Sequence, residues 1–274
     1  MSSFPEDVSN KSLADLVSLK GKRAVITGAW RGMGRSIARR LSEAGASVLL
    51  TDINGAGAEA TAAEIAGEFG GVVFGAEMDV ANVKAISDGA DLAVKKLGGI
   101  DIWVNNAGIY PSGTALLDTS CDTWDRVLDI NLRGTFAGIQ EAAKRMISAG
   151  HGGVIINNSS TAGYNGGSPS LSHYTASKWG VRGLTASTAR ELALHDIRVL
   201  AVAPNGIFTE GVDLEWQKSI DGGFTDLEAS MMGLYRRKGN GDDVARVVLF
   251  CASDLSSWMT GSTLAVDAGQ LVVH

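Results

Sequence analysis

The sequence predicts an α/β fold in which a doubly wound, parallel sheet of about seven strands is covered by helices on both faces. Short apolar runs rich in Val and Ile alternate with longer helical patterns along the chain, and this alternation is typical of a parallel sheet buried on both sides. A glycine-rich turn connects the first strand to the first helix. The chain has 274 residues, of which 45% are hydrophobic, so it is long enough to build one large core.

Each strand is expected where a short apolar run occurs, and the helices are expected where helical patterns separate these runs. The strands are predicted at 23–27, 47–52, 72–78, 101–105, 153–158, 197–203 and 263–266. The helices are predicted at 32–44, 55–69, 82–97, 122–149, 174–194 and 241–252, the second of them rich in alanine. The connections between parallel strands should be right-handed crossovers. Trp103 alternates within the fourth strand and is expected in the core.

The chain is predicted to form one domain with an N-terminal arm. Residues 1–20 are polar with scattered apolar positions and are expected to be loosely attached, and residues 21–274 form a single domain without repeats or low-complexity linkers. The segment at about 207–238 is too long for an ordinary connection and is predicted to be a substrate loop. Four residues of this segment, together with Tyr164, are expected either to line a substrate pocket or to serve only for packing. The four are Trp216, Met231, Met232 and Tyr235.

Composition excludes several classes of function. A net charge of −6 and a pI of about 5.3 argue against nucleic-acid binding. No apolar run approaches the ~20 residues that span a bilayer, and the first residues do not resemble a secretory signal, so a soluble, cytoplasmic protein without membrane partners is expected. Two cysteines do not make a disulfide framework. The four histidines have no metal-ligand spacing, and no metal is expected.

The glycine-rich turn has the chemistry of a phosphate site. Gly28, Gly32 and Gly34 are spaced Gly-x-x-x-Gly-x-Gly, with Arg31 and Met33 inside the turn. Glycines allow close approach of the backbone to a phosphate, and the helix N-terminus that follows adds N–H groups and positive dipole. With 35 glycines in the chain, the spacing alone is weak evidence. Its place at the first strand–helix junction is what indicates a dinucleotide site.

Asp52, at the end of the second strand, favours NAD over NADP. A carboxylate about twenty residues after such a turn can accept both hydroxyls of the adenosine ribose and repels a 2′-phosphate. Ile53 follows it, with no adjacent basic side chain. Arg31 is the residue that could reverse this preference. The alternative is that Asp52 is only a turn carboxylate.

Further candidate cofactor residues lie at the ends of the third and fourth strands. Asp79 and Val80 close the third strand, where the carboxylate can meet the adenine amino group. Asn106, Ala107 and Gly108 close the fourth, where amides can tie neighbouring strands and small residues leave room for the cofactor. Ligands bind at the carboxyl ends of strands in open parallel sheets.

Tyr174 and Lys178 form the most informative pair. They are four residues apart and therefore share one helix face. A nearby ammonium favours the phenolate, so Lys178 is expected to lower the pKa of Tyr174 from its ordinary value of about 10 towards the range of a useful base. By chance alone, such a pair occurs in roughly one of seven chains of this composition.

Taken together, these motifs resemble the single-domain short-chain dehydrogenase/reductase family. The resemblance implies a Rossmann-like sheet of seven parallel strands, a nicotinamide cofactor, and commonly a homotetramer, with a dimer as the alternative. It runs in order over about residues 21–270. The matching residues are Thr27 to Gly34, Asp52, Asp79, Asn105 to Gly108, Asn131, Ser159, Ser160, Tyr174 to Lys178, Thr260, Gly261 and Val266 to Gly269.

The resemblance implies catalytic roles for four residues. Tyr174 is the general base or acid, Lys178 also binds the nicotinamide ribose, and Ser160 stabilises charge on the substrate oxygen. Asn131 would hold a water that links Lys178 to solvent, or would be a buried polar residue bonded to backbone. Ser159 is the alternative to Ser160. His173, beside Tyr174, points about 100° away on a helix and is not assigned as the base.

Two departures from the family pattern affect the pocket. Pro204, Gly206, Ile207 and Thr209 match cofactor-binding positions after the sixth strand, but Asn205 stands where the family usually has glycine. Asn can also adopt positive φ, so the turn is expected to survive. The stretch from Ser160 to Tyr174 is one residue longer than expected, with the extra residue placed within 165–170, where it would reshape one wall of the pocket.

The predicted function is NAD-dependent, reversible hydride transfer between nicotinamide and a secondary alcohol, polyol or sugar, with a small-molecule alcohol or carbonyl as substrate. An NADP-dependent ketone or 3-oxoacyl reductase on the same scaffold is the first alternative. A nucleotide-binding protein without catalysis is the second.

Overall fold

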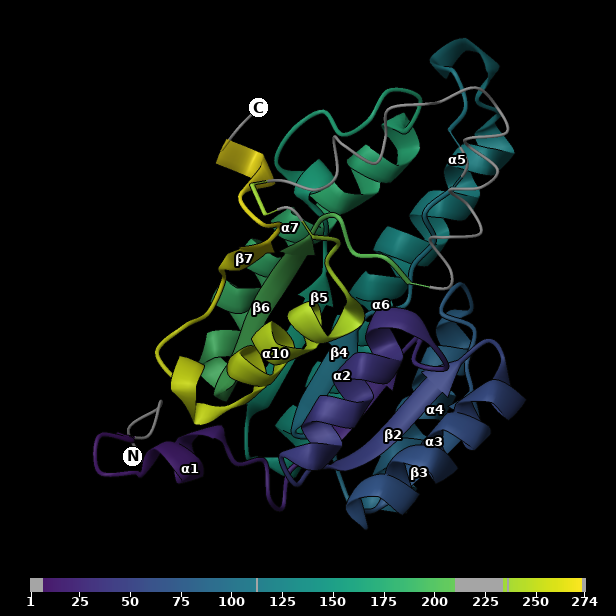
Figure 1. Cartoon of the computed structure of the whole chain (residues 1–274). Coiled ribbons are helices and arrows are strands. Elements are labelled where there is room, and N and C mark those ends of the chain that lie inside the picture. Colours follow the sequence, from purple (N-terminus) through teal and green to yellow (C-terminus); the bar gives the residue numbers. More distant parts are fainter. Residues whose placement is uncertain (1–6, 112, 210–233, 236, 273–274) are drawn as a thin grey trace.

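The computed structural model of the chain describes residues 7–111, 113–209, 234–235 and 237–272 (Figure 1). It contains a parallel sheet of seven strands in the order β3-β2-β1-β4-β5-β6-β7, which confirms the predicted fold class. The strands are β1 (Arg23–Thr27), β2 (Ser47–Asp52), β3 (Val73–Glu77), β4 (Ile102–Asn105), β5 (Gly153–Asn158), β6 (Ile197–Pro204) and β7 (Thr263–Val266). Because β1 pairs with both β2 and β4, the strand order reverses beside β1, where doubly wound sheets bind their ligands.

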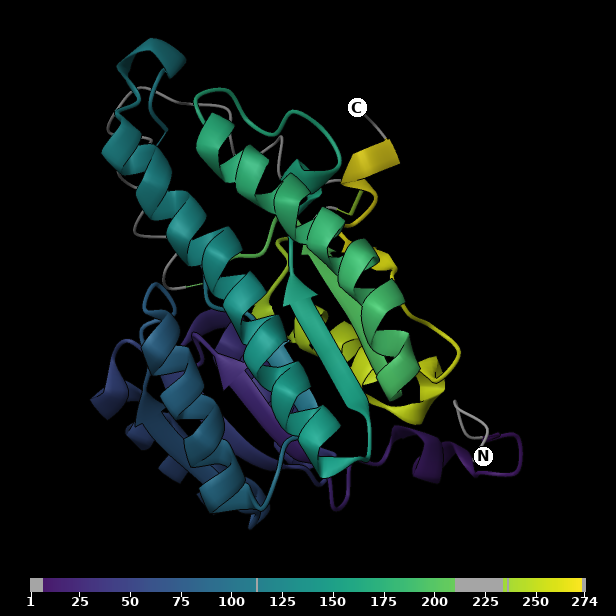
Figure 2. The same cartoon turned by 180° about the vertical axis from the view of Figure 1, so that it is seen from behind.

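Helices cover both faces of the sheet, as Figures 1 and 2 show from opposite sides. One face carries α2 (Gly32–Glu43), α3 (Gly55–Phe69) and α10 (Gly241–Ala252), and the other carries α4 (Val83–Leu97), α6 (Gly134–Ala149) and α7 (Ser172–Leu192). Figure 2 shows α6 and α7 running along the sheet near β5. The short α5 (Cys121–Leu128) precedes α6.

Alternate strand residues enter two separate cores. Ile26 and Leu50 are fully buried in the cluster under α2 and α10, whereas Val25 and Leu49 are fully buried in the cluster under α4 and α6. Both side-chain directions are therefore apolar, which is why the strands occur in the sequence as continuous hydrophobic runs. Trp103 is buried in the second cluster, as expected.

The helix expected at 122–149 is interrupted by a π-helix. Residues Asp129–Arg133 form this element, η2, between α5 and α6. Short π segments inside helices are rare and occur often at functional sites. The hydrophobic pattern does not reveal the extra residue, because the pattern continues on both sides of it. Asn131 lies within η2 and is 1% exposed.

The described part of the N-terminal arm is attached to the domain. A short helix, α1 (Leu13–Val17), begins at the N-cap Ser12. Leu19 is 1% exposed within the α2-side core, and its N–H donates to the carbonyl of Ala44 (2.7 Å). The core therefore begins before residue 21, because one leucine in the polar arm packs inward.

Most of the predicted substrate loop lies outside the described residues, including Trp216, Met231 and Met232. Its two ends meet, since Ile207 and Gly239 form a parallel β-bridge. Tyr235 is 67% exposed. In the described part of the chain, no helix combines the length and apolar character that a membrane span requires.

Candidate active site

The glycine turn between β1 and α2 is built for close backbone approach. Gly28 and Gly32 have φ of +63° and +58°, a region that favours glycine. A Cβ on Gly34 would lie 2.1 Å from the carbonyl oxygen of Gly28, so a larger residue does not fit. The N-cap Arg31 makes no side-chain capping bond to α2. This turn and helix N-terminus therefore fit the pyrophosphate of a dinucleotide.

Asp52 lies beside this turn at the carboxyl end of β2. Its carboxylate accepts from the backbone N–H groups of Trp30 (3.2 Å) and Asn54 (3.0 Å), which fix its position. Ile53 is 70% exposed. The Arg31 guanidinium lies 4.8 Å from the centre of the Trp30 ring. Asp52 and Arg31, the two residues that bear on the preference for NAD or NADP, therefore both contact Trp30.

The other predicted cofactor residues also follow carboxyl ends of strands. Asp79 accepts from the N–H of Ala81 (2.9 Å), and Val80 packs against Gly134. The Asn106 amide donates to the carbonyls of Thr27 (2.9 Å) and Gly28 (2.8 Å). Asn106 therefore ties the end of β4 to the glycine turn, as the sequence predicted for an amide at this place.

Ala107, Met33 and Gly108 complete this side of the site. A Cβ on Gly28 would lie 2.7 Å from the Cα of Ala107, and one on Gly108 would lie 3.1 Å from Oδ1 of Asn131 and 3.7 Å from Nζ of Lys178. Met33 packs partly buried against the α2-side core. Gly108 therefore lies between the glycine turn and the side chains of Asn131 and Lys178.

The segment after β6 returns to the glycine turn. Thr209 lies across from Gly32, whose Cβ position is 3.3 Å from the Thr209 side chain. Pro204 pairs with Val266 at the end of the sheet. The expected turn survives, but Gly206 has the positive φ of +63°, and Asn205 is not in the left-handed region. Asn205 instead accepts from the Thr161 hydroxyl (3.2 Å) and so tethers the strand end to the Ser160 loop.

Tyr174, Lys178 and Ser160 come together as predicted. Tyr174 is in the first turn of α7, and the Lys178 ammonium lies 5.6 Å from the centre of its ring. Lys178 is 5% exposed and donates to the Asn158 carbonyl (2.8 Å). Ser160 follows β5 and hydrogen-bonds the Tyr174 side chain. A phenol, a hydroxyl and an ammonium therefore meet at the carboxyl ends of the central strands.

Ser159 and Ser160 point to different partners. The Ser159 hydroxyl is buried and donates to the backbone carbonyl of Lys178 (3.0 Å), so it fastens the strand end to α7. The Ser160 hydroxyl accepts from the N–H of Ala162 (3.2 Å) and faces Tyr174. This geometry supports the assignment of Ser160 over Ser159.

Burial dominates the acid–base properties of the pair. It raises the pKa of Tyr174 to about 12; the hydrogen bond with Ser160 acts in the opposite direction, and Tyr110 adds to the rise. Burial also lowers the pKa of Lys178 to about 8. The predicted lowering of the Tyr174 pKa is therefore wrong for the chain by itself, because removal from water disfavours the phenolate more than its neighbours favour it.

Asn131 acts on the backbone after β4. Its Oδ1 accepts from the N–H of Ile109 (2.8 Å), its Nδ2 donates to the Ile109 carbonyl (2.9 Å), and the same nitrogen reaches the Ser177 hydroxyl (3.3 Å). The side chain thus satisfies the buried-polar alternative considered from the sequence. The role in holding a water stays a prediction.

Tyr110 is a site residue that sequence reasoning missed. It directly follows the Asn-Asn-Ala-Gly-Ile stretch, and its ring lies edge-on against Tyr174 with centroids 5.0 Å apart. An aromatic residue just after a ligand-binding strand end was the available signal. His173 is fully buried, which lowers its pKa. Tyr164 donates its hydroxyl to the Thr263 carbonyl (2.8 Å) and lies under the Arg182 guanidinium, so it serves packing.

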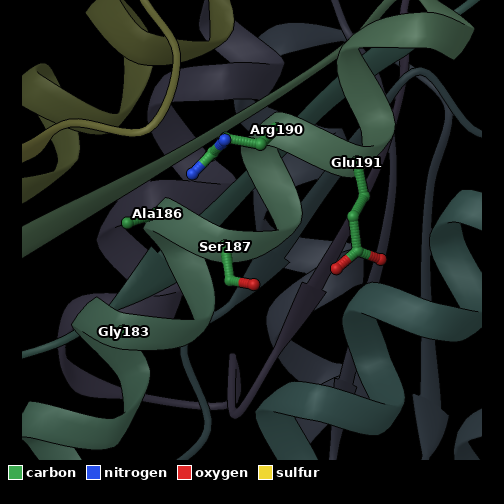
Figure 3. A pocket seen from close by; sticks show the side chains of 5 residues that line it. All are labelled: Gly183, Ala186, Ser187, Arg190 and Glu191. Atoms are coloured by element: carbon green, nitrogen blue, oxygen red, sulfur yellow. The ribbon is translucent and has the colours of Figure 1, made fainter.

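Two surface hollows lie away from these residues. The first is on the outer side of α7 and is lined by Gly183, Ala186, Ser187, Arg190 and Glu191 (Figure 3). The second adjoins it between α7 and the α5–α6 region, where its walls include Leu132, Phe136 and Leu184. Neither hollow includes Ser160, Tyr174 or Lys178. Within the described ranges, no three His, Cys, Asp or Glu side chains gather as a metal site would require.

Known proteins match the chain over nearly its whole length. Residues 28–270 match the family described as enoyl-(acyl carrier protein) reductase. The short chain dehydrogenase/reductase astE of Aspergillus oryzae is 36% identical, covering 92% of this chain and 95% of that protein. The 3-oxoacyl-(acyl-carrier-protein) reductase of Aquifex aeolicus is 35% identical, covering 92% and 98%. The crystal structure of carveol dehydrogenase from Mycobacterium avium in complex with NAD superimposes with a TM-score of 0.86 at 34% identity, covering 93% and 99%.

Proposed function

The chain belongs to the short-chain dehydrogenase/reductase family of oxidoreductases acting on CH–OH groups, and we propose that it catalyses NAD-dependent, reversible oxidation of a secondary alcohol, polyol or sugar hydroxyl. The observation that carries the proposal is the meeting of Tyr174, Ser160 and Lys178 beside a turn that fits a dinucleotide. The nicotinamide cofactor supplies the hydride chemistry when bound. The protein must orient the alcohol and move one proton.

Tyr174 is the group that moves this proton. In oxidation its phenolate oxygen takes the proton of the substrate hydroxyl, and in reduction the phenol returns it to the substrate oxygen. Ser160 donates a hydrogen bond to that oxygen and stabilises the charge that develops on it. A Tyr174 pKa of about 12 is too high for this task at neutral pH. The Lys178 ammonium and the positive charge of oxidised nicotinamide would both favour the phenolate.

Replacing Tyr174 by Phe tests the mechanism. The Tyr174→Phe variant keeps the ring and loses the proton donor and acceptor, so turnover should fall by about 10²- to 10⁴-fold. Binding of NAD, measured by calorimetry, should change little. The assay is a screen of secondary alcohols, polyols and sugars that follows reduced nicotinamide by absorbance. Full hydride transfer by this variant would exclude Tyr174 as the base, and a non-catalytic nucleotide-binding protein would show no turnover in the wild type.

The preference for NAD rests on Asp52. Its carboxylate is held by two backbone N–H groups at the strand end, where it can accept the ribose hydroxyls and would repel a 2′-phosphate. The carveol dehydrogenase structure in complex with NAD supports this choice. Asp52→Asn should weaken NAD binding and improve NADP binding, each by about tenfold. Glu64→Gln, on the exposed surface of α3, is the control for loss of one negative charge.

An NADP-dependent ketone or 3-oxoacyl reductase is the second candidate. Arg31 favours it, because its guanidinium lies over the ring of Trp30, and the backbone N–H of Trp30 donates to Asp52. The Aquifex aeolicus relative, which is named as a 3-oxoacyl reductase, also supports it. Arg31→Ala should selectively weaken NADP binding if this candidate is correct. A wild-type kcat/KM that is higher with NADP than with NAD would decide for it.

We also propose a homotetramer, or a dimer, that uses the outer face of α6 and α7. Phe136 is 46% exposed on this face, and the hollow beside it is lined by small residues of α7 such as Gly180 and Gly183. An exposed apolar surface with small residues allows close approach of a second copy. Phe136→Glu should reduce the molar mass found by light scattering, whereas Leu13→Glu, on the distant α1, should not.

A further inference from the structure

Tyr110 packs directly against the proposed acid–base residue. The rings of Tyr110 and Tyr174 meet at 75° with centroids 5.0 Å apart, which is a favourable edge-to-face geometry. The two residues come from different elements, because Tyr110 lies in the stretch after β4 and Tyr174 lies in the first turn of α7. Their contact is therefore made by the tertiary fold and not by local helix geometry.

The Tyr110 ring is held from both ends. The Asn131 amide makes two hydrogen bonds to the backbone of Ile109, the residue before it, at 2.8 and 2.9 Å. At the other end, the Tyr110 hydroxyl hydrogen-bonds the side chain of Ser168. The N–H of Thr114 also donates to the carbonyl of Ser170 (2.9 Å). These two hydrogen bonds join the stretch after β4 to the stretch before α7, next to the Tyr174 ring.

We propose that Tyr110 is a positioning residue that holds the Tyr174 ring in the orientation in which its hydroxyl faces Ser160. In this arrangement Asn131 acts through Tyr110, since it fixes the backbone from which that ring projects. The segment at 165–170 acts through Ser168. The inference rests on the proposed function of Tyr174 and adds a residue that the motifs did not include.

The electrostatic surroundings of Tyr174 give the proposal a distinct signature. Among the described residues, the side chains that contact or face it are those of Lys178 in α7, Ser160 after β5 and Tyr110 after β4. Of these, Tyr110 raises the pKa of Tyr174 and Ser160 lowers it. The hydrogen bond from Ser160 is the larger of these two effects, and the proposal makes Tyr110 responsible for keeping it. Removing the Tyr110 ring should therefore weaken that bond and raise the pKa of Tyr174 further. A purely structural defect would not move the pH profile in this direction.

The experiment compares Tyr110→Leu with Tyr110→Phe. Tyr110→Leu removes the ring contact, and we expect kcat to fall by about tenfold to a hundredfold because small displacements of catalytic groups are costly. Its kcat/KM for alcohol oxidation should reach the plateau at higher pH than in the wild type, because the Ser160 bond no longer favours the phenolate. Tyr110→Phe keeps the ring and should stay within about threefold of the wild-type kcat. Tyr164→Phe, which loses the hydroxyl bonded to the Thr263 carbonyl, is the matched control.

A second measurement does not depend on turnover. Tyrosine labelled with ¹³C at Cζ gives one NMR signal per tyrosine, and Tyr174→Phe identifies the signal of Tyr174. In Tyr110→Leu this signal should begin to titrate at higher pH than in the wild type. If no alcohol is oxidised, the proposed function fails while this titration still decides the role of Tyr110.

Two results would overturn the inference. One is an unchanged kcat and pH profile in Tyr110→Leu; the other is a loss of kcat with no shift of either the profile or the NMR titration, which would make Tyr110 a packing residue only. If Tyr110→Leu does not fold, Tyr110→Met, which fills more of the space without an aromatic edge, takes its place in both measurements.

Discussion

Replacing the buried Lys178 by methionine should change how the stability of the protein depends on pH. Lys178 is 5% exposed, and burial lowers its pKa from 10.5 to about 8. Below about pH 8 the lysine is charged in both the folded and the unfolded state, so its titration contributes nothing there. Between the two pKa values the unfolded chain holds the proton and the folded chain does not. The wild type should therefore gain stability, relative to Lys178→Met, as pH rises through this window.

The size of the gain follows from the two pKa values. One pKa unit corresponds to about 1.4 kcal/mol, so the free energy of unfolding of the wild type minus that of Lys178→Met should increase by about 2.5 kcal/mol between pH 7 and pH 10. Lys178→Met also loses the hydrogen bond to the Asn158 carbonyl, but this loss lowers its stability at pH 7 and at pH 10 alike and cancels in the change between them. Tyr174 does not disturb the window, since its raised pKa reduces stability only above about pH 10.

Urea unfolding followed by tryptophan fluorescence measures this difference at each pH. Lys95→Met, on the exposed surface of α4, corrects for the general effect of removing one positive charge. A difference that stays constant within about 0.5 kcal/mol across the window would show that Lys178 is not desolvated by the fold, and the burial argument would be refuted.

Three further substitutions test the packing that supports the site. Gly34→Ala would place a Cβ 2.1 Å from the Gly28 carbonyl oxygen, so it should lower the free energy of unfolding by about 3 kcal/mol or more and weaken coenzyme binding. Gly67→Ala, in α3 with nothing within 4 Å of the added Cβ, should instead raise the free energy of unfolding by about 0.5–1 kcal/mol. Urea unfolding measures the stability of each variant, and calorimetry measures coenzyme binding. Ser159→Ala should lower the free energy of unfolding by about 1 kcal/mol and leave most of the activity, while Ser160→Ala should lower kcat by about 10²-fold. If the two variants showed the opposite effects, Ser159 would be the residue that contacts the substrate oxygen. Asn157→Ala leaves the buried Nδ2 of Asn105 without its acceptor and removes one of the two hydrogen bonds of the Thr185 hydroxyl. It should cost about 2–3 kcal/mol in thermal or urea unfolding, and a neutral result would mean that water replaces the amide.

The fold could be predicted because its signals are local and repeated. The inner strands such as β1 and β6 are apolar on both faces, and the junction of β1 with α2 needs glycines at positive φ, so both features are visible in the sequence. The π-helix around Asn131 could not be predicted, because one extra residue in a helical turn leaves the hydrophobic pattern intact. Tertiary contacts of this kind decide where the Asn131 amide points.

The site was predictable to the extent that spacing controls it. Tyr174 and Lys178 share a helix face in any α-helix. Asp52 ends β2 and Ser160 follows β5, and the carboxyl ends of parallel strands lie at one edge of the sheet. The direction of the Tyr174 pKa could not be predicted from spacing, because it depends on how many groups surround the phenol. Tyr110 was missed for the same reason: its partner is 64 positions further along the chain, and only the folded arrangement brings the rings to 5.0 Å.

Leu19 makes the N-terminal stretch part of the hydrophobic core. Its side chain fills a place beneath α2, between residues that the rest of the sheet supplies, and its N–H completes the C-terminal end of that helix by donating to Ala44. A shortened polypeptide starting at residue 21 would open a void there, which for a buried leucine costs about 2–5 kcal/mol. Leu19 thus stabilises α2 from below, and removing it would weaken the helix whose first turn is proposed to hold the cofactor phosphates.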